Sequence, residues 1–170
     1  MSSSKESVCR IGPTGDMVPV RRLFREYAAE AGLDLSFQGF AEELAGLPGR
    51  YASPGGSILL AEVDGEAVGC VALRPLGGLG LCEKNRLFVR PGFTGHGLGR
   101  RLAQAAVATA RERGYTAMRL DTLSSMRAAN VLYRRLGFRP IAPYCFNPLP
   151  GALFYELDLT ATMGLDTRHD

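Results

Sequence analysis

The stretch Leu87-Phe-Val-Arg-Pro-Gly-Phe-Thr-Gly-His-Gly-Leu-Gly-Arg-Arg-Leu102 decides the fold predicted for this chain. It begins as an apolar strand that stops at Pro91, passes through a loop with glycine at every second position, and enters an alanine-rich helical pattern. Such glycines let successive backbone N–H groups turn toward one point, where the end of a helix adds a positive dipole. The stretch therefore predicts a phosphate-binding turn. Arg100 and Arg101 either add positive charge there or are simply solvated.

Other classes of glycine-rich loop fit this spacing poorly. A Walker loop ends in Gly-Lys-Ser/Thr, which does not occur here. The dinucleotide fingerprint needs a third glycine where Arg100 stands and an unbroken βαβ unit opening the chain. The spacing favours a pyrophosphate loop deep in the sequence. A Rossmann nucleotide binder stays as an alternative, and it predicts retention of NADH rather than coenzyme A.

Length and composition indicate one globular domain. The chain has 170 residues, of which 46% are hydrophobic and 22% charged. A net charge of +3 is too small to argue for nucleic acid. The four cysteines are scattered without a Cys-x-x-Cys pair, which argues against a zinc site and favours a reducing cytoplasm. No apolar run approaches the length of a signal or a membrane span, so we expect no membrane partner.

The order of predicted elements gives the fold class. With helices and strands written in chain order, the pattern reads βααβββαβαββ, which indicates an α/β fold around one mixed, mostly antiparallel sheet flanked by helices. A strand, helix and strand across residues 87–121 predict a parallel pair. We expect a single domain over residues 1–160 and a loose tail over 161–170. The predicted strands are 8–11, 57–63, 66–74, 81–90, 115–121, 138–141 and 153–159, and the helices begin at Asp16, about Ser36, the glycine loop, and Ser124 or Ser125.

Two separate motifs carry a resemblance to a known family. Thr94 to Gly99 resembles the pyrophosphate motif Arg/Gln-x-x-Gly-x-Gly/Ala of the GNAT superfamily of N-acetyltransferases, with Thr94 where that family usually has Arg or Gln. The segment Ala129-Asn-Val-Leu-Tyr-Arg-Arg-Leu-Gly-Phe138 resembles its second signature, Ala-x-x-Leu-Tyr-x-x-x-Gly-Phe. The element order is also that of the family, so the resemblance covers nearly the whole chain. It implies a cytoplasmic GNAT enzyme, similar to small bacterial members of unassigned substrate, that uses acetyl-CoA and no metal.

The resemblance also implies roles for particular residues. Tyr133 stands where the family has the general acid that protonates the departing thiolate; the alternative is a tyrosine packed on the sheet with its hydroxyl satisfied by backbone. Backbone groups of the strand edge at Leu87 and Val89 pair with the pantetheine arm. The family often has an Asn at the position of Met126. Asn130 is the substitute for it that this chain offers. The implied cofactor-binding residues are Leu87, Phe88, Val89, Thr94, Gly95, His96, Gly97, Leu98, Gly99, Arg100, Asn130 and Tyr133; for Thr94 and His96 the alternative is that they fill turn positions.

A base is needed because an acceptor ammonium has a pKa of about 10. Glu83 lies where the histone-acetylating branch of the family places a glutamate base. The alternatives are a water chain as base, and a surface ion pair of Glu83 with Lys84 or Arg86. In a regular strand Glu83, Asn85, Leu87 and Val89 share one side, whereas a bulge would change that parity.

The function predicted from this reasoning is acetyl transfer from acetyl-CoA to a primary amine of a small molecule or peptide, by direct attack in a ternary complex. The alternative is a CoA-binding module without transfer activity. Segments expected to face the acceptor are the first two helices, the loop around Tyr51, and residues 144–151. The sequence leaves open the acceptor and whether the protein is a monomer or a homodimer.

Overall fold

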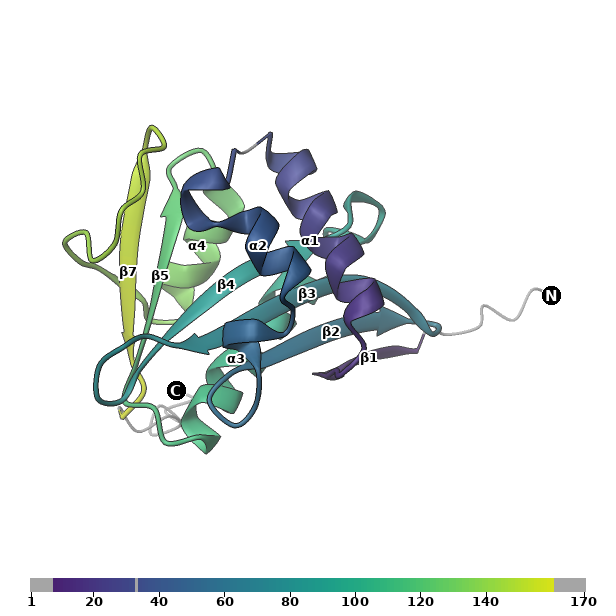
Figure 1. The fold of residues 1–170 in the computed structure, drawn as a ribbon, viewed down its shortest axis with the longest axis horizontal. Helices are drawn as coiled ribbons and strands as arrows, with labels where there is room; N and C mark the ends of the chain where they lie inside the picture. The colour runs from purple at the N-terminus through teal and green to yellow at the C-terminus, as the bar shows by residue number, and fades with distance from the viewer. Residues whose placement is uncertain (1–7, 33, 161–170) are drawn as a thin grey trace, which may run out of the picture.

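The computed structural model describes residues 8–32 and 34–160, so the tail predicted at 161–170 lies outside the described residues. Seven strands form one sheet with helices on both faces (Figure 1). The chain order of helices and strands is the predicted βααβββαβαββ, which confirms the α/β class. The elements are β1 (Cys9–Pro13), α1 (Met17–Ala31), the 3-10 helix η1 (Ser36–Gln38), α2 (Phe40–Ala45), η2 (Gly49–Tyr51), β2 (Ser57–Val63), β3 (Glu66–Pro75), β4 (Leu81–Val89), η3 (Pro91–Phe93), α3 (Leu98–Glu112), β5 (Ala117–Leu123), α4 (Arg127–Arg135), β6 (Arg139–Pro140) and β7 (Ala152–Asp158).

The sheet opens between its two central strands. Its strand order is β1-β2-β3-β4-β5-β7-β6, and β4 and β5 form the predicted parallel pair. They pair only over Leu81–Glu83 and Ala117–Arg119, and beyond this point they diverge (Figure 1). Within the described residues, the β5-facing edge of β4 therefore has no partner strand from residue 84 onward. The backbone groups on that edge are left for another partner.

Each face of the sheet has its own hydrophobic core. Helices α1 and α2 cover one face, where Phe24 and Tyr51 pack with Phe88. Helices α3 and α4 cover the other, where Leu102 and Tyr133 join a larger core. Burial of each such side chain contributes about 1.5–3 kcal/mol before the cost of ordering is subtracted. No helix among the described residues has the length and apolar character needed to cross a membrane.

A bulge in β4 decides which side chains share a face. Cys70 of β3 lies opposite Phe88 and Ala72 lies opposite Asn85, so two residues of β4 oppose one of β3. Arg86 takes a positive φ of 57° at this point. The extra residue reverses the alternation of side chains. Of the two alternatives for this strand, the bulge is therefore the one that holds: Glu83 and Asn85 face α2, whereas Leu87 and Val89 pack on the α3 side.

Two helix starts also differ from the sequence prediction. The helix expected from Ser36 is a 3-10 turn and then α2, separated by Gly39 at φ 67°. Neither Ser124 nor Ser125 caps α4: its N-cap is Met126, and no side chain caps it. Ser124 instead donates its N–H to the carbonyl of Gly151 at 2.8 Å. That bond keeps the serine in the strand-end turn beside β7.

Candidate active site

A groove of about 550 Å³ lies between the end of β4, the glycine loop and α4. Its wall on α4 is mainly apolar and includes Ala128, Ala129 and Leu132. The predicted cofactor-binding residues that the structure brings together in this groove are Leu87, Phe88, Val89, Thr94, Gly95, Gly97, Leu98, Gly99 and Arg100.

The N-terminus of α3 opens onto this groove. Its N-cap is Gly97 at φ 77°, no side chain caps it, and its first turn contains no acid. The first helical bond runs from the N–H of Arg101 to the carbonyl of Gly97 at 3.0 Å, so the N–H groups of residues 98–100 precede the helical ladder. A Cβ built on Gly95 or Gly97 would meet no protein atom within 4 Å. Free N–H groups at the positive end of a helix form an anion site.

Three predicted cofactor-binding residues do not line the groove: His96, Asn130 and Tyr133, of which Tyr133 lines the neighbouring small cavity. His96 is exposed in the loop. Asn130 is 6% exposed, and its Nδ2 donates to the carbonyl of Leu123 at 2.9 Å, so the side chain faces the end of β5. The expected hydrogen bond from Asn130 to pantetheine therefore has no support in its placement. Thr94 does line the groove, but its hydroxyl donates to the carbonyl of Pro91 at 3.0 Å and so stabilises the turn.

Tyr133 lies at a small cavity of about 70 Å³ where β4 and β5 diverge. Its hydroxyl accepts a hydrogen bond of 2.8 Å from Nζ of Lys84. Its ring packs against Phe138 and Tyr155, as the packing alternative expected, but the partner of the hydroxyl is a lysine rather than backbone. Both Tyr133 and Lys84 are 4% exposed. No further partner for the Tyr133 hydroxyl is seen in the described part of the chain, which leaves its proton free to be donated.

Burial changes the proton affinities of this pair. Loss of solvent raises the pKa of Tyr133, with a further contribution from the charge of Asp121, so the phenol stays protonated at neutral pH. The same loss of solvent lowers the pKa of Lys84 from 10.5 to about 7. Of the twenty Lys and Arg residues, only Lys5 and Lys84 are lysines. An arginine would stay charged at position 84, whereas the lysine exchanges a proton near neutral pH.

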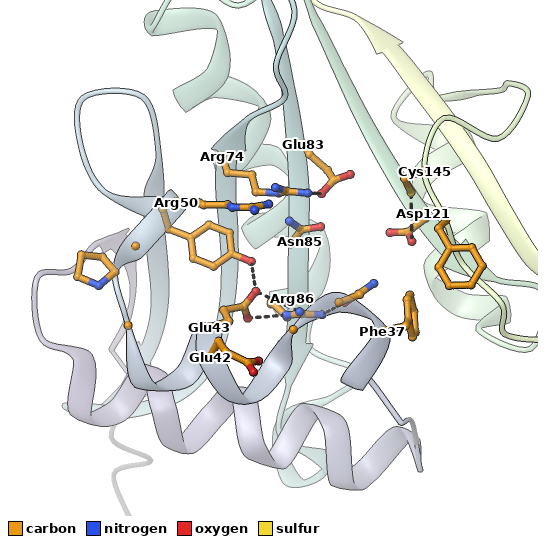
Figure 2. Close-up of a pocket in the computed structure, with 17 residues that line it drawn as sticks. Phe37, Glu42, Glu43, Arg50, Arg74, Glu83, Asn85, Arg86, Asp121 and Cys145 are labelled. Carbon is orange, nitrogen blue, oxygen red and sulfur yellow. Dashed lines mark hydrogen bonds and ion pairs between the residues drawn. The ribbon is translucent and has the colours of Figure 1, made fainter.

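On the other side of the small cavity lies a pocket of about 620 Å³ between β4, α2 and the 144–151 loop (Figure 2). Asn85, Arg86 and Asp121 line both this acceptor pocket and the small cavity. Leu87 and Ala129 line both the small cavity and the groove. The groove, the small cavity and the acceptor pocket therefore adjoin in series. Two molecules entering from opposite ends would meet beside Tyr133.

Glu83 is buried in the acceptor pocket and hydrogen-bonded through both oxygens. It is 3% exposed, and its Oε1 accepts from Nη2 of Arg74 at 2.7 Å. Its Oε2 accepts from the hydroxyl of Tyr144 at 2.6 Å. The alternative of a surface ion pair with Lys84 or Arg86 is wrong, because Arg86 pairs with Glu43 at 3.0 Å. Glu83 thus lines the larger pocket, and its partners come from other segments of the chain.

Asp121 is a second carboxylate at this centre that the sequence analysis missed. It lies in β5, and its Oδ2 accepts from Nδ2 of Asn147 at 3.0 Å. Burial, and then the negative charge of Glu83, raises the pKa of Asp121. An acid inside the apolar run Leu120-Asp-Thr-Leu123 was the available signal. Its closeness to Glu83 depends on how β4 and β5 pair.

Neither Cys145, which lines this pocket, nor Cys82, which lies in the core under α3 and α4, is an activated nucleophile. Burial raises the pKa of Cys82 and of Cys145 to about 12, so both stay protonated at neutral pH. This argues against an acetyl-cysteine relay. Among residues 8–32 and 34–160, no group of three or more His, Cys, Asp or Glu is placed to hold a metal ion.

Comparison with known proteins finds similarity to acetyltransferases, over half of the chain in one case and over nearly all of it in others. Residues 54–140 match the acetyltransferase (GNAT) domain. An uncharacterised N-acetyltransferase of Schizosaccharomyces pombe is 37% identical over 161 residues, which cover 94% of this chain and 99% of that protein. A GNAT acetyltransferase of Staphylococcus aureus has a TM-score of 0.73 at 21% identity, with 89% of this chain and 99% of that one covered. An acetyltransferase of Salmonella typhimurium, solved with its cofactor acetyl-CoA, has a TM-score of 0.69 at 21% identity over 96% and 99%.

Proposed function

The chain belongs to the GNAT family of acetyltransferases, and on this basis we propose that it transfers the acetyl group of acetyl-CoA directly to a primary amine in a ternary complex. The observation that carries the proposal is the series of three adjoining spaces. An anion-binding helix end lies at one side, a buried Lys84–Tyr133 pair in the middle, and Glu83 and Asp121 at the other. This arrangement supports two substrates that meet at one point.

In this proposal the groove holds the cofactor through backbone groups. The N–H groups between residues 95 and 100 bind the diphosphate, and Arg100 adds charge beside them. The unpaired edge of β4 at Leu87 and Val89 pairs with the amides of the pantetheine arm, as an added strand does. The bound arm then leads the thioester toward the small cavity that Tyr133 lines. Backbone binding of this kind does not depend on the side chain at position 94, where this chain has Thr and the family usually has Arg or Gln.

Starting from the ammonium form, two protons must leave the nitrogen and one must reach sulfur. A carboxylate or a water it orients takes the first proton, the amine nitrogen attacks the acetyl carbonyl carbon, and the carbon–sulfur bond breaks. Tyr133 gives its hydroxyl proton to the departing thiolate, and the Lys84 ammonium, bonded at 2.8 Å, replaces that proton. The second proton from the nitrogen then restores the charge of Lys84, and the carboxylate releases the first to solvent. The products are the acetylated amine, the free thiol of coenzyme A and one proton released to solvent.

Between the two carboxylates, Asp121 is the better placed base. It lines both the small cavity and the acceptor pocket, whereas Glu83 lines only the pocket. Both oxygens of Glu83 already accept from Arg74 and Tyr144. The raised pKa of Asp121 brings it toward the range in which a base works near neutral pH. Glu83 then assists Asp121: its negative charge attracts the ammonium group of the acceptor and raises the proton affinity of Asp121.

The second candidate is a CoA-binding module without transfer activity. Calorimetry with coenzyme A, followed by a thiol-release assay with acetyl-CoA and a panel of primary amines, separates the two. We expect binding and amine-dependent release of thiol. Binding without release for every amine would establish the module, and absence of binding would overturn both candidates.

A further inference from the structure

The acceptor pocket contains charges of both signs, and most of them are already paired. Arg74 pairs with Glu83 at 2.7 Å, and Arg86 pairs with Glu43 at 3.0 Å. Arg50 also lines the pocket, and it has no hydrogen-bond or ion-pair partner among the described residues. Figure 2 shows the side chains of Arg50 and Arg74 extending in the same direction into the pocket toward β4. The positive side of the pocket therefore has guanidinium N–H groups that no acceptor of the described protein occupies.

Arg74 also keeps part of its guanidinium free. Its Nε and Nη2 both donate to Oε1 of Glu83, at 3.0 and 2.7 Å. Within the described residues, its Nη1 group has no acceptor. The free N–H groups of Arg50 and of Arg74 match the two oxygens of a carboxylate, which guanidinium groups bind through parallel hydrogen bonds.

The negative side of the pocket begins next to these arginines. Glu83 is bonded to Arg74 itself, and Asp121 lies on the neighbouring strand β5 at the junction with the small cavity. A ligand with a carboxylate on Arg50 and Arg74 would thus present a nearby ammonium group to Glu83 and Asp121. Four acids line the pocket, and two of them, Glu43 and Glu83, are already neutralised by arginines. Among the described residues, Glu42 and Asp121 are left without an ion pair, and the unpaired Arg50 opposes a polyamine on the same wall.

From this charge arrangement we propose that the acceptor is a free amino acid, held by its carboxylate on Arg50 and Arg74 and acetylated on its α-amino group. The proposal rests on the proposed acetyl transfer and narrows its acceptor. A volume of about 620 Å³ accommodates a small molecule of this size. Phe37 and Phe146, whose rings meet edge to face at 6.2 Å, provide an apolar wall for the side chain of the ligand.

The test compares acceptors that differ only in the carboxylate. Thiol release from acetyl-CoA is measured with the twenty amino acids, and then, for the best of them, with its amide and its decarboxylated amine. We expect kcat/KM to fall about 10-fold to 100-fold for both analogues, since a charge-assisted hydrogen bond is lost. In Arg50→Gln, KM for the amino acid should rise on the order of 10-fold at nearly constant kcat, while KM for the amide stays unchanged.

Arg25→Gln is the matched control, because Arg25 is also an exposed arginine but lines none of the three spaces. It should behave as the wild type with every acceptor. Equal turnover of the amino acid and its amide, or turnover of other amines but of no amino acid, would overturn the inference and leave the acetyl transfer standing. Absence of CoA binding, or of turnover with any amine, would overturn both.

Discussion

The groove and the acceptor pocket are built in opposite ways. The groove takes its proposed anion site from the backbone groups of one continuous stretch, residues 94–100. The acceptor pocket takes side chains from five separate parts of the chain, between Phe37 and Phe146. In the groove the chemistry is a property of the local backbone path, whereas in the pocket it arises from pairs such as Arg74 and Glu83. A substrate that a whole family shares can be bound by backbone groups of one local segment. Selection of one acceptor requires side chains from several segments.

The two long helices of the protein show the same difference at their N-termini. Asp16 caps α1 by accepting from the N–H of Val18 at 3.1 Å. Helix α3 begins at Gly97 and has no side-chain cap. A capped helix end satisfies its own donors and contributes to stability, whereas an uncapped one keeps them for a ligand. Helix α4 is uncapped as well, so the absence of a cap at α3 bears on function only together with the glycine loop and the groove that its N-terminus lines.

The largest effect is expected at Lys84, where groove and pocket adjoin. The pKa of Lys84 in the folded protein is about 7, below its value of 10.5 when unfolded, so the unfolded chain binds more protons between these values and stability rises with pH. Relative to Lys84→Met, the free energy of unfolding of the wild type should rise by roughly 1.4 kcal/mol per pH unit, or about 4 kcal/mol between pH 7 and 10. Denaturant unfolding at several pH values measures this. Arg25→Met is the control, and a difference between wild type and Lys84→Met that is constant with pH would contradict a buried lysine of low pKa.

The second effect is on the proton donor. In Tyr133→Phe the thiolate leaves without protonation, so kcat should fall on the order of 100-fold while the dissociation constant of CoA stays nearly constant. Steady-state kinetics and calorimetry measure the two quantities. Tyr115→Phe loses a hydroxyl that donates to the carbonyl of Gly55 at 2.7 Å, away from the groove, and should keep its activity. Unchanged turnover in Tyr133→Phe would remove this residue from the mechanism.

The third effect ranks the two carboxylates of the pocket. Asp121→Asn should lower kcat by about 30-fold, because the proposed base then has no site for the proton. Glu83→Gln should lower it by less, about 10-fold, since Glu83 is expected to act beside the base. Steady-state kinetics of both variants with one acceptor gives the comparison. A larger loss in Glu83→Gln than in Asp121→Asn would exchange their roles.

The smallest effect tests the backbone site of the groove. Gly97→Val should weaken CoA binding by on the order of 10-fold, because a side chain would stand where the backbone opens onto the groove. Gly114→Val is the matched control: Gly114 also has a positive φ, 83°, and an open surrounding, but it follows the opposite end of α3. Both variants carry backbone strain, and only the first should raise the dissociation constant. Equal affinities in calorimetry would contradict the phosphate site.

Local sequence features predicted the elements well where the interactions that form them are local. In the structure Asp16 caps α1, Gly32 ends it in the left-handed region, and Asp64-Gly65 connects β2 to β3, each in agreement with the ordinary preference of these residues for such positions. The prediction was wrong where a distant segment competes with a local rule. Ser124 is bonded to Gly151 and does not cap α4, and the bulge at Arg86 depends on the register of β4 against β3.

The sequence by itself determined the order of the elements, and it predicted a phosphate-binding turn and a role for Tyr133, because periodicity, glycine spacing and short motifs are properties of neighbouring residues. Only the tertiary structure decided what the polar side chains do. Lys84 reaches Tyr133 across 49 positions of the chain, and Tyr144 reaches Glu83 across 61. Such pairs form because the divergence of β4 and β5 opens the sheet and because the adjacent strand residues Glu83 and Lys84 point to opposite faces of it. Proton affinity in a buried site depends on which groups meet there, and that meeting is a property of the fold.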